Sequence, residues 1–336
     1  MTDTVSVIGA GSWGTTLAKI LGDNGRHVLL WSRNADQCRA INGDHRNERY
    51  LPGFELPKKI EATTDLQRAC ESARLILLVV PSHGLRKVAF QMGDFLGGDQ
   101  MIVHATKGIE IETGKRMSQV IREETCIRKV GVLAGPNLAR ELAARKPAGT
   151  LIASPFDEVF LAAQEAFHNN YFRAYAGHDV VGAEVGGAFK NIIAVAAGLV
   201  DGLELGDNTK ALLLTRGLNE MARLGDTMGA QVMTFGGMAG IGDLMCTCAS
   251  TLSRNHQVGE RLATGQRRAQ IQKEMHMVAE GVKTTKAIHL YSQYKGLDLP
   301  IAEAVYQLLY SRRSVKRVIE ELMARPAADE FGELVI

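Results

Sequence analysis

The sequence predicts an α/β first half, built on a doubly wound sheet, followed by an all-α second half. Three observations support this prediction. Short apolar runs alternate with helical stretches up to about residue 180, a glycine-rich turn follows the first run, and no convincing strand comes after Val180. A chain of 336 residues is long enough for two domains. We place them at residues 1–185 and 186–336.

Six runs predict strands in the first half: Val5–Gly9, Val28–Trp31, Leu75–Pro81, Met101–Thr106, Val130–Ala134 and Thr150–Ser154. They are continuously apolar, which is typical of parallel strands that helices cover on both faces. Gly14–Asn24 has helical composition, and Gly25 is placed to end that helix. Repeated strand–helix–strand units predict right-handed crossovers.

The second half predicts helices at Asp179–Asp201, Lys210–Leu224, Thr284–Tyr294 and Ile301–Tyr310. A composition of 46% hydrophobic and 23% charged residues is typical of a soluble globular protein. The net charge of +2, without dense runs of one sign, argues against a nucleic acid or an anionic membrane as partner. The longest uncharged apolar stretch, Ile192–Val200, is far shorter than the ~20 residues that span a bilayer.

The N-terminus has no basic segment followed by an apolar core, so we expect no signal peptide. The five scattered cysteines favour a reducing cytoplasm over a disulfide framework. Cys246 and Cys248 have no second pair at the spacing of a zinc site, and the nine histidines form no ligand-spaced cluster. We therefore expect a cytoplasmic protein without a metal site.

Gly9-Ala-Gly11-Ser-Trp-Gly14 matches the G-x-G-x-x-G pattern of dinucleotide-binding turns. The pattern is weak alone, but here it follows an apolar strand and opens a helix. Gly9 permits the tight turn, Gly11 lets the backbone approach a pyrophosphate, and Gly14 lets the helix pack on the strand. The free N–H groups of the helix attract phosphates. The sequence therefore predicts a Rossmann-type NAD(P) site, with a purely structural turn as the alternative.

Arg33 stands at the end of the second predicted strand, about where NAD-specific sites carry an acidic residue. An acid would repel a 2′-phosphate, whereas a guanidinium pairs with one through its forked donors. We therefore expect NADP(H) as the preferred cofactor, with NAD(H) usable as well. A solvated surface cation is the alternative interpretation of Arg33.

Two lysines are candidates for chemistry. Lys107 follows a predicted strand at the sheet edge where open α/β folds bind ligands, although a solvated loop cation is the alternative. Lys190 lies in an apolar helix, where Gly186 and Gly187 share its face. Because lysine is rarely buried without a partner, either a ligand or an acid such as Glu184 must meet it.

Ser253-Arg254-Asn255 follows the sequence Gly240-Ile-Gly-Asp243-Leu-Met-Cys-Thr247. A hydroxyl, a guanidinium and an amide can all donate to an oxyanion. A helix cap beside a surface arginine is the alternative.

Taken together, the motifs resemble NAD(P)-dependent glycerol-3-phosphate dehydrogenases of the bacterial soluble kind, over essentially the whole chain. The resemblance rests on the order and spacing of Gly9–Gly14, Pro81-Ser-His83, Lys107-Gly108, Gly135-Pro-Asn137, Lys190-Asn191, Gly242-Asp243-Leu244, Ser253-Arg-Asn255 and Val278-Ala-Glu280-Gly281. It implies interconversion of dihydroxyacetone phosphate and sn-glycerol 3-phosphate, a product that feeds phospholipid synthesis, and a homodimer.

The resemblance also implies residue roles. Lys190 would donate and accept the proton at the substrate oxygen, beside Lys107, Asp243 and Thr247. The substrate would contact Lys107, Gly135, Asn137, Lys190, Asn191, Asp243, Ser253, Arg254 and Asn255, with Arg254 and Asn255 holding its phosphate. The cofactor would contact Gly9, Gly11, Ser12, Trp13, Gly14, Arg33, Lys107, Ala139, Arg254, Val278 and Glu280. Asn137 departs from the serine frequent in the family, but its amide can still donate.

A free lysine has a pKa near ~10.4, too high for an efficient base in the oxidation direction. We expect burial and the charge of Lys107 to lower the pKa of Lys190.

Two other classes of protein share parts of this pattern. Ketopantoate reductases and β-hydroxyacid dehydrogenases also carry a lysine on a helix, but they explain Ser253-Arg-Asn255 and Lys107-Gly108 less well. A non-catalytic NADP(H)-sensing protein would need the glycine turn and Arg33. It would have no use for Lys190, Asp243 and Arg254 together.

Overall fold

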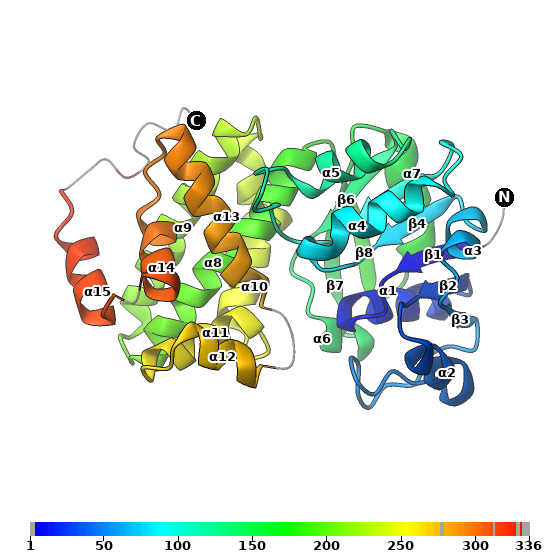
Figure 1. Cartoon of the computed structure of the whole chain (residues 1–336), viewed down its shortest axis with the longest axis horizontal. Coiled ribbons are helices and arrows are strands. Elements are labelled where there is room, and N and C mark those ends of the chain that lie inside the picture. Colours follow the sequence, from blue (N-terminus) through cyan, green and yellow to red (C-terminus); the bar gives the residue numbers. More distant parts are fainter. Residues whose placement is uncertain (1–3, 276–278, 312, 327–329, 331–336) are drawn as a thin grey trace. The chain divides into compact units, whose positions relative to one another are not determined.

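The chain folds into two compact units, seen in a computed structural model that describes residues 4–275, 279–311, 313–326 and 330 (Figure 1). Unit 1 comprises Met1–Thr106 and Met117–Val180, and unit 2 comprises Lys107–Arg116 and Val181–Ile336. A division between residues 185 and 186 keeps Lys107–Arg116 in the first domain, whereas the contacts within the chain group this segment with the second.

Unit 1 is built on an eight-stranded sheet in the order β3-β2-β1-β4-β5-β6-β7-β8. The strands are β1 (Thr4–Ile8), β2 (His27–Trp31), β3 (Ile60–Thr63), β4 (Leu75–Leu78), β5 (Met101–His104), β6 (Val130–Ala134), β7 (Ala148–Ala153) and β8 (Phe172–Gly177). Neighbouring strands are parallel except for the antiparallel pair β6 and β7. The strand order reverses between β1 and β4, so the predicted doubly wound α/β class is confirmed.

All six predicted strands are present, five of them with shifted ends, but β3 and β8 were not predicted. Both lie at edges of the sheet, and their residues alternate between more and less buried positions. The prediction relied on continuous apolar runs, which edge strands do not need because one face can meet water. The expectation of parallel strands was wrong at β7, which pairs antiparallel with β6.

Helices cover both faces of the sheet, because successive strand residues point to opposite sides. Val7, Leu77 and Val103 belong to one buried cluster, and Ile76 and Ile102 belong to another. The first cluster includes residues of α1 (Ser12–Asp23), α2 (Ala35–Asp44), α6 (Ala139–Ala143) and α7 (Asp157–Phe167). The second includes residues of α3 (Leu66–Glu71), α4 (Ser82–Gly93) and α5 (Met117–Glu124).

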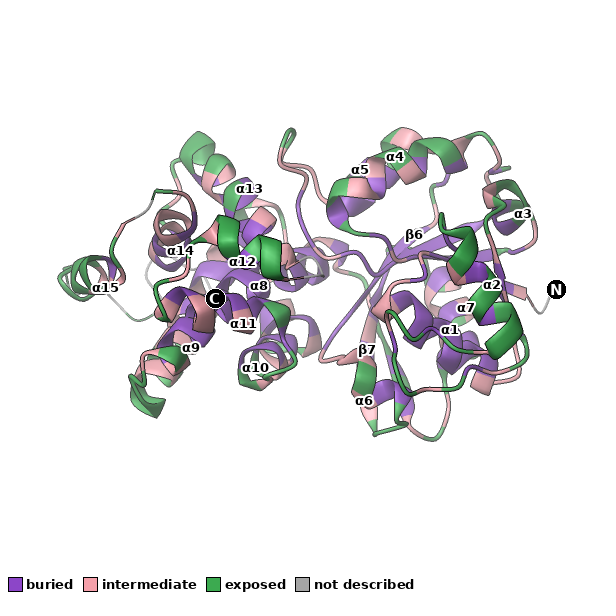
Figure 2. Ribbon diagram, turned by 60° about the horizontal axis from the view of Figure 1, so that its bottom comes forward, coloured by how far each residue is buried: buried purple, intermediate pink, exposed green. Residues whose placement is uncertain are grey.

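Unit 2 is helical and is organised around α8 (Val180–Gly202). The other elements are α9 (Asp207–Thr227), the 3-10 turn η1 (Val232–Gly236), the π-turn η2 (Met238–Gly242), α10 (Asp243–Ala249), α11 (Arg254–Ala263), α12 (Arg268–Glu274), α13 (Glu280–Lys295), α14 (Pro300–Tyr310) and α15 (Val315–Met323). The four helices predicted for this half are all present. Figure 2 shows α8 buried along nearly its whole length.

By length and composition α8 could cross a membrane, and it is the one helix in the described part of the chain that could. However, 89% of its most apolar stretch is buried inside the protein. Phe189, Ile192 and Ile193 are fully buried and belong to the core of unit 2. The apolar character of α8 is therefore that of the central helix of a helical domain.

Candidate active site

The glycine turn of unit 1 brings backbone so close to backbone that two of its glycines cannot carry a side chain. Gly9 has φ +121°, and a Cβ built on it would lie 2.4 Å from the carbonyl oxygen of Val79. A Cβ on Gly14 would lie 1.8 Å from the carbonyl oxygen of Gly9. By contrast, a Cβ on Gly11 would meet none of the described atoms within 4 Å. Gly11 therefore borders open space, as a turn that receives a pyrophosphate requires.

The N-terminus of α1 is suited to an anion. Its N-cap is Gly11, which supplies no side-chain cap, and the first turn of the helix holds no acid. The N–H groups and the positive end of the helix dipole therefore face the open side of Gly11. The donor set and the open space fit a dinucleotide phosphate.

Two polar side chains that were not predicted from the sequence hold this turn in place. The amide nitrogens of Gln37 and Asn47 both donate to the carbonyl oxygen of Ala10, at 2.6 and 3.0 Å. Asn47 is buried and also donates to the hydroxyl of Thr15 at 2.7 Å. Their role is seen only from their contacts with the turn in the folded chain, which the sequence pattern does not reveal.

Arg33 is exposed just beyond the end of β2. Among the described residues no acid pairs with it. Its neighbour Ser32 is buried and donates its hydroxyl to Gln37 at 2.7 Å. The guanidinium of Arg33 is thus available to a ligand at the carboxyl end of the strand.

Gly135, Asn137 and Ala139 follow β6. Gly135 has φ +144°, and the Asn137 amide donates to the carbonyl oxygen of Gly149 at 2.9 Å. The Asn137 Oδ1 atom is buried and accepts no hydrogen bond from the described residues. The hydroxyl of Thr16, on α1, reaches the carbonyl oxygen of Ala139 at 3.3 Å. The start of α6 therefore lies beside the glycine-turn helix.

Unit 2 brings together the four residues expected at the reacting centre. Lys190 on α8 forms an ion pair with Oδ1 of Asp243, the first residue of α10. Its Nζ also donates to the hydroxyl of Thr247 at 2.7 Å. The Nζ of Lys107 lies 2.6 Å from Oδ2 of the same aspartate. Asp243 thus bridges two lysines, and both it and Lys190 are buried.

Small residues let α10 begin this close to α8. A Cβ on Gly186 would lie 2.2 Å from the carbonyl oxygen of Ala239, inside the π-turn that precedes Asp243. A Cβ on Gly240 would lie 2.0 Å from the carbonyl oxygen of Phe235. Gly186 permits the close approach of the π-turn to α8, and Gly240 permits the close packing of η1 on η2.

The pKa of Lys190 is lowered to about 8: burial is the largest cause, the charge of Asp243 acts in the opposite direction, and the charge of Lys107 adds to the lowering. Burial by itself would raise the pKa of Asp243, but the two lysines outweigh it and hold this pKa below its usual value. The expected cause of the lowered lysine pKa is confirmed. Asp243 stays ionised, and Lys190 is poised to exchange a proton near neutral pH.

Glu184 is not the partner of Lys190. It forms an ion pair with Arg116 instead, and its side chain is 2% exposed. The alternative interpretation of Lys190, an ion pair with Glu184 or another acid, is therefore wrong for Glu184 but confirmed for another acid, Asp243.

The three residues of the predicted phosphate triplet, Ser253-Arg254-Asn255, have different environments in the structure. The hydroxyl of Ser253 caps α11 by accepting from the backbone N–H of His256 at 3.3 Å. The Asn255 amide donates to Oδ1 of Asn191 at 2.8 Å and accepts from the N–H of Gly281 at 2.9 Å. Arg254 is an exposed residue at the first position of α11, but burial of its guanidinium lowers its pKa, whereas the charge of Glu280 acts in the opposite direction.

The remaining expected contacts lie on other elements. Ser12 and Trp13 open α1, and Glu280 opens α13. Val278 lies outside the described residues. Within the described part of the chain, no three histidine, cysteine or acidic side chains converge as a metal site would require.

A dinucleotide turn on a doubly wound sheet, followed by a helical unit with a buried Lys–Asp–Lys cluster, defines the class of dehydrogenase-type proteins with a Rossmann domain and an all-helical partner domain. Comparison with protein-family models narrows this class to one family. The N-terminal model of NAD-dependent glycerol-3-phosphate dehydrogenase matches residues 4–159, and the C-terminal model matches residues 179–320. The chain belongs to the NAD-dependent glycerol-3-phosphate dehydrogenase family.

Individual relatives agree over nearly the whole length. The chain is 44% identical over 336 residues to glycerol-3-phosphate dehydrogenase [NAD(P)+] of Geobacillus thermodenitrificans, covering 99% of this chain and 98% of that protein. The crystal structure of glycerol-3-phosphate dehydrogenase from Coxiella burnetii has a TM-score of 0.92 at 34% identity, covering 96% of this chain and 99% of that one. A ketopantoate reductase from Ralstonia eutropha shares only the fold, with a TM-score of 0.59 at 16% identity over 95% and 99% of the chains.

Proposed function

We propose that this protein interconverts dihydroxyacetone phosphate and sn-glycerol 3-phosphate by hydride transfer to and from NAD(P)(H). The observation that carries the proposal is the cluster in which Asp243 bridges Lys107 and Lys190, placed in a chain of this family. When bound, the nicotinamide supplies or removes the hydride at the substrate carbon. Every other step belongs to side chains of this protein.

Lys190 is the proton donor in reduction. Negative charge builds on the carbonyl oxygen as its carbon is reduced, and an ammonium group in a buried site both stabilises that charge and hands over a proton. A pKa of about 8 makes this proton transferable near neutral pH. In oxidation, the neutral amine takes the hydroxyl proton back. Asp243 orients both lysines, and the hydroxyl of Thr247 accepts from Lys190 and so fixes the direction of its remaining N–H bonds.

Arg254 is the main contact for the substrate phosphate, because its guanidinium carries several donors and burial of this group, which lowers its pKa, favours an anionic partner. Asn255 retains one N–H for the phosphate, while its other amide atoms join α8 to α13. Lys107, Gly135, Asn137, Asn191 and Ser253 complete the proposed substrate contacts. The resemblance to the family supports these further roles.

The glycine turn holds the cofactor pyrophosphate on α1, beside Ser12 and Trp13. Arg33 supports a preference for NADP(H) over NAD(H), because it is exposed at the end of β2 and can pair with a 2′-phosphate. Ala139, Lys107, Arg254, Val278 and Glu280 are the other proposed cofactor contacts. We further propose a cytoplasmic homodimer whose product supplies phospholipid synthesis, as the resemblance implies.

A substrate panel tests the function. Loss of reduced-nicotinamide absorbance is followed with dihydroxyacetone phosphate, ketopantoate and a β-keto acid, each with NADPH and with NADH. We expect turnover with dihydroxyacetone phosphate alone, and faster with NADPH at low cofactor concentration. Turnover with another acceptor only would assign the site to a related reductase. Tight NADPH binding without any turnover would favour a sensing protein.

A further inference from the structure

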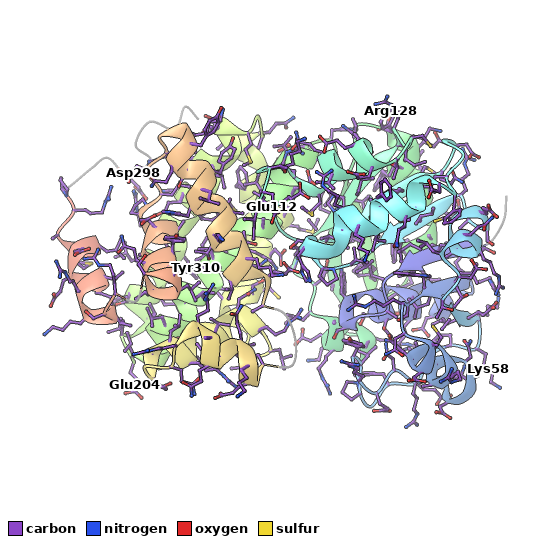
Figure 3. The ribbon with its side chains drawn as sticks, in the orientation of Figure 1. Lys58, Glu112, Arg128, Glu204, Asp298 and Tyr310 are labelled. Carbon is purple, nitrogen blue, oxygen red and sulfur yellow. The ribbon has the colours of Figure 1, made fainter. Side chains whose placement is uncertain are left out.

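The segment Lys107–Arg116 interrupts unit 1 in sequence but belongs to unit 2. It is a compact hairpin, closed by an antiparallel bridge between Ile109 and Arg116. At its tip the N–H of Gly114 donates to the carbonyl oxygen of Glu110 at 2.9 Å, and Gly114 has φ +68°. Glu112 marks the exposed tip in Figure 3. Because the hairpin is closed on itself, a contact near one end constrains the other end.

A buried ion pair joins the hairpin to α8. Nη1 of Arg116 lies 2.5 Å from Oε2 of Glu184, and the two side chains are 15% and 2% exposed. Ile109, which pairs with Arg116 across the hairpin, is buried in the core of unit 2. Tyr291 also contacts this region, since a Cβ on Gly114 would lie 3.3 Å from its ring. A charge pair this buried is costly to break because its charges have been removed from water.

The other end of the hairpin is Lys107, which lies along the same helix. Glu184, Gly187 and Lys190 follow one another at intervals of three residues on α8, so they lie along one side of it. A Cβ on Gly187 would contact Cγ and Cδ of Lys107 at 3.7 Å. The lysine stem thus lies over Gly187, between the anchoring pair and Lys190. Its ammonium reaches Asp243 at 2.6 Å.

We propose that Arg116 and Glu184 are positioning residues, whose ion pair fixes the Lys107–Arg116 hairpin on α8 and so holds the Lys107 ammonium at Asp243. The inference deepens the proposed function and rests on it. Neither residue needs to touch the substrate. Their role is to keep a second cation beside Lys190.

The proposal has an electrostatic consequence at Lys190. The charged groups that face Lys190 are Lys107 from the hairpin and Asp243 from α10, and the anchoring pair lies further along α8. If the hairpin is released, Lys107 withdraws and Asp243 has only Lys190 to neutralise it. Both changes favour the charged form, so the pKa of Lys190 must rise.

Glu184→Gln separates this role from a direct effect of charge. Removing the negative charge of Glu184 through space alone would lower the pKa of Lys190, whereas releasing Lys107 raises it. We expect a rise of about one unit. It is measured as the Cε chemical shift of Lys190 in protein labelled with ¹³C-lysine, and as the pH midpoint of kcat/KM. We also expect kcat/KM for dihydroxyacetone phosphate to fall about 10- to 100-fold, with a much smaller loss of NADPH affinity, because Lys107 is one of many proposed cofactor contacts.

Glu184→Asp keeps the charge and shortens the side chain, so any rise of the Lys190 midpoint in this variant reports movement of the hairpin. We expect a smaller rise and a smaller loss of kcat/KM than in Glu184→Gln. Lys115→Met is the matched control, since it removes a neighbouring cation of the same hairpin and should leave the midpoint in place. The proposal is wrong if two results are found together: the Lys190 midpoint falls or stays unchanged in Glu184→Gln, and it does not move in Glu184→Asp.

The positioning role of Arg116 and Glu184 and the proposed function can be contradicted independently. The ¹³C titration needs no turnover, so it tests the positioning role even in a protein inactive toward dihydroxyacetone phosphate. Inactivity of the unmodified protein would contradict the proposed function alone.

Discussion

The candidate sites of the two units differ in the groups that form them. In unit 1 the site is backbone: Gly9 and Gly14 leave no room for a Cβ, and helix N–H groups face the open side of Gly11. In unit 2 the site is side chain: two lysines share Asp243 inside a helical core. A backbone site is damaged by adding an atom, whereas a charged site is damaged by removing a charge. The predictions below test this difference.

The largest effect is expected for Lys190→Ala. Loss of the proton donor and of its charge should lower kcat for dihydroxyacetone phosphate reduction by about 10³- to 10⁴-fold. NADPH affinity, measured by nucleotide fluorescence, should stay within about twofold because the glycine turn belongs to unit 1. A variant that kept a tenth of its rate would remove Lys190 from the proposed role.

Gly14→Ala should break unit 1 by adding one methyl group. The new Cβ would lie 1.8 Å from the Gly9 carbonyl oxygen, so α1 must shift. We expect a loss of about 1–3 kcal/mol in the free energy of unfolding and little remaining NADPH affinity. Gly11→Ala is the matched control: it should change the free energy of unfolding by about 0.5 kcal/mol or less, yet weaken NADPH binding. Equal loss of stability in both variants would contradict the distinction.

Arg33→Ser should alter cofactor choice without affecting the substrate. Loss of a charge-assisted pair with the 2′-phosphate should raise the Kd of NADPH by about 10- to 100-fold and leave that of NADH nearly unchanged. Both values are measured by isothermal titration calorimetry. A parallel loss for both cofactors would mean that Arg33 supports the fold of the turn instead.

The pH dependence of the unmodified enzyme gives the mildest change. With its pKa lowered to about 8, Lys190 is charged below that pH and neutral above it. The kcat/KM for dihydroxyacetone phosphate reduction should therefore fall as pH rises through about 8, while that for glycerol 3-phosphate oxidation should rise. Both profiles are recorded between pH 6 and 10. If both pH profiles changed in the same direction, Lys190 would be excluded as the titrating group.

The sequence predicted the parts of the molecule that depend on local pattern. The parallel strands of the sheet centre are continuous apolar runs, the long helices of unit 2 have apolar periodicity, and the glycine turn has fixed spacing. The edge strands β3 and β8 were not predicted because only part of their residues are buried, so they form no continuous apolar run. The reversal at β7 depends on a choice of partner strand, which short-range pattern does not encode.

The site was predicted through its residues rather than its geometry. Lys107 and Asp243 are far apart in the chain, so their contact followed only from the resemblance to a family. Glu184 was considered a partner for Lys190 because they share a helix, but Arg116 competes for it from the hairpin. Ser253 and Asn255 were expected to contact the substrate. In the structure the Ser253 hydroxyl caps α11, and the Asn255 amide joins α11 to α8 and α13.

The path of the chain between the units limits how this protein can be taken apart. The boundaries at 106/107, 116/117 and 180/181 make three passages from one unit to the other. A single cut therefore cannot yield two intact domains. Expressed alone, residues 181–336 would carry Asp243 and Lys190 without the second lysine, and residues 1–180 would carry a hairpin with no helix to dock on. Domain exchange between relatives must transplant Lys107–Arg116 together with the C-terminal half, or it will pair each hairpin with a foreign α8.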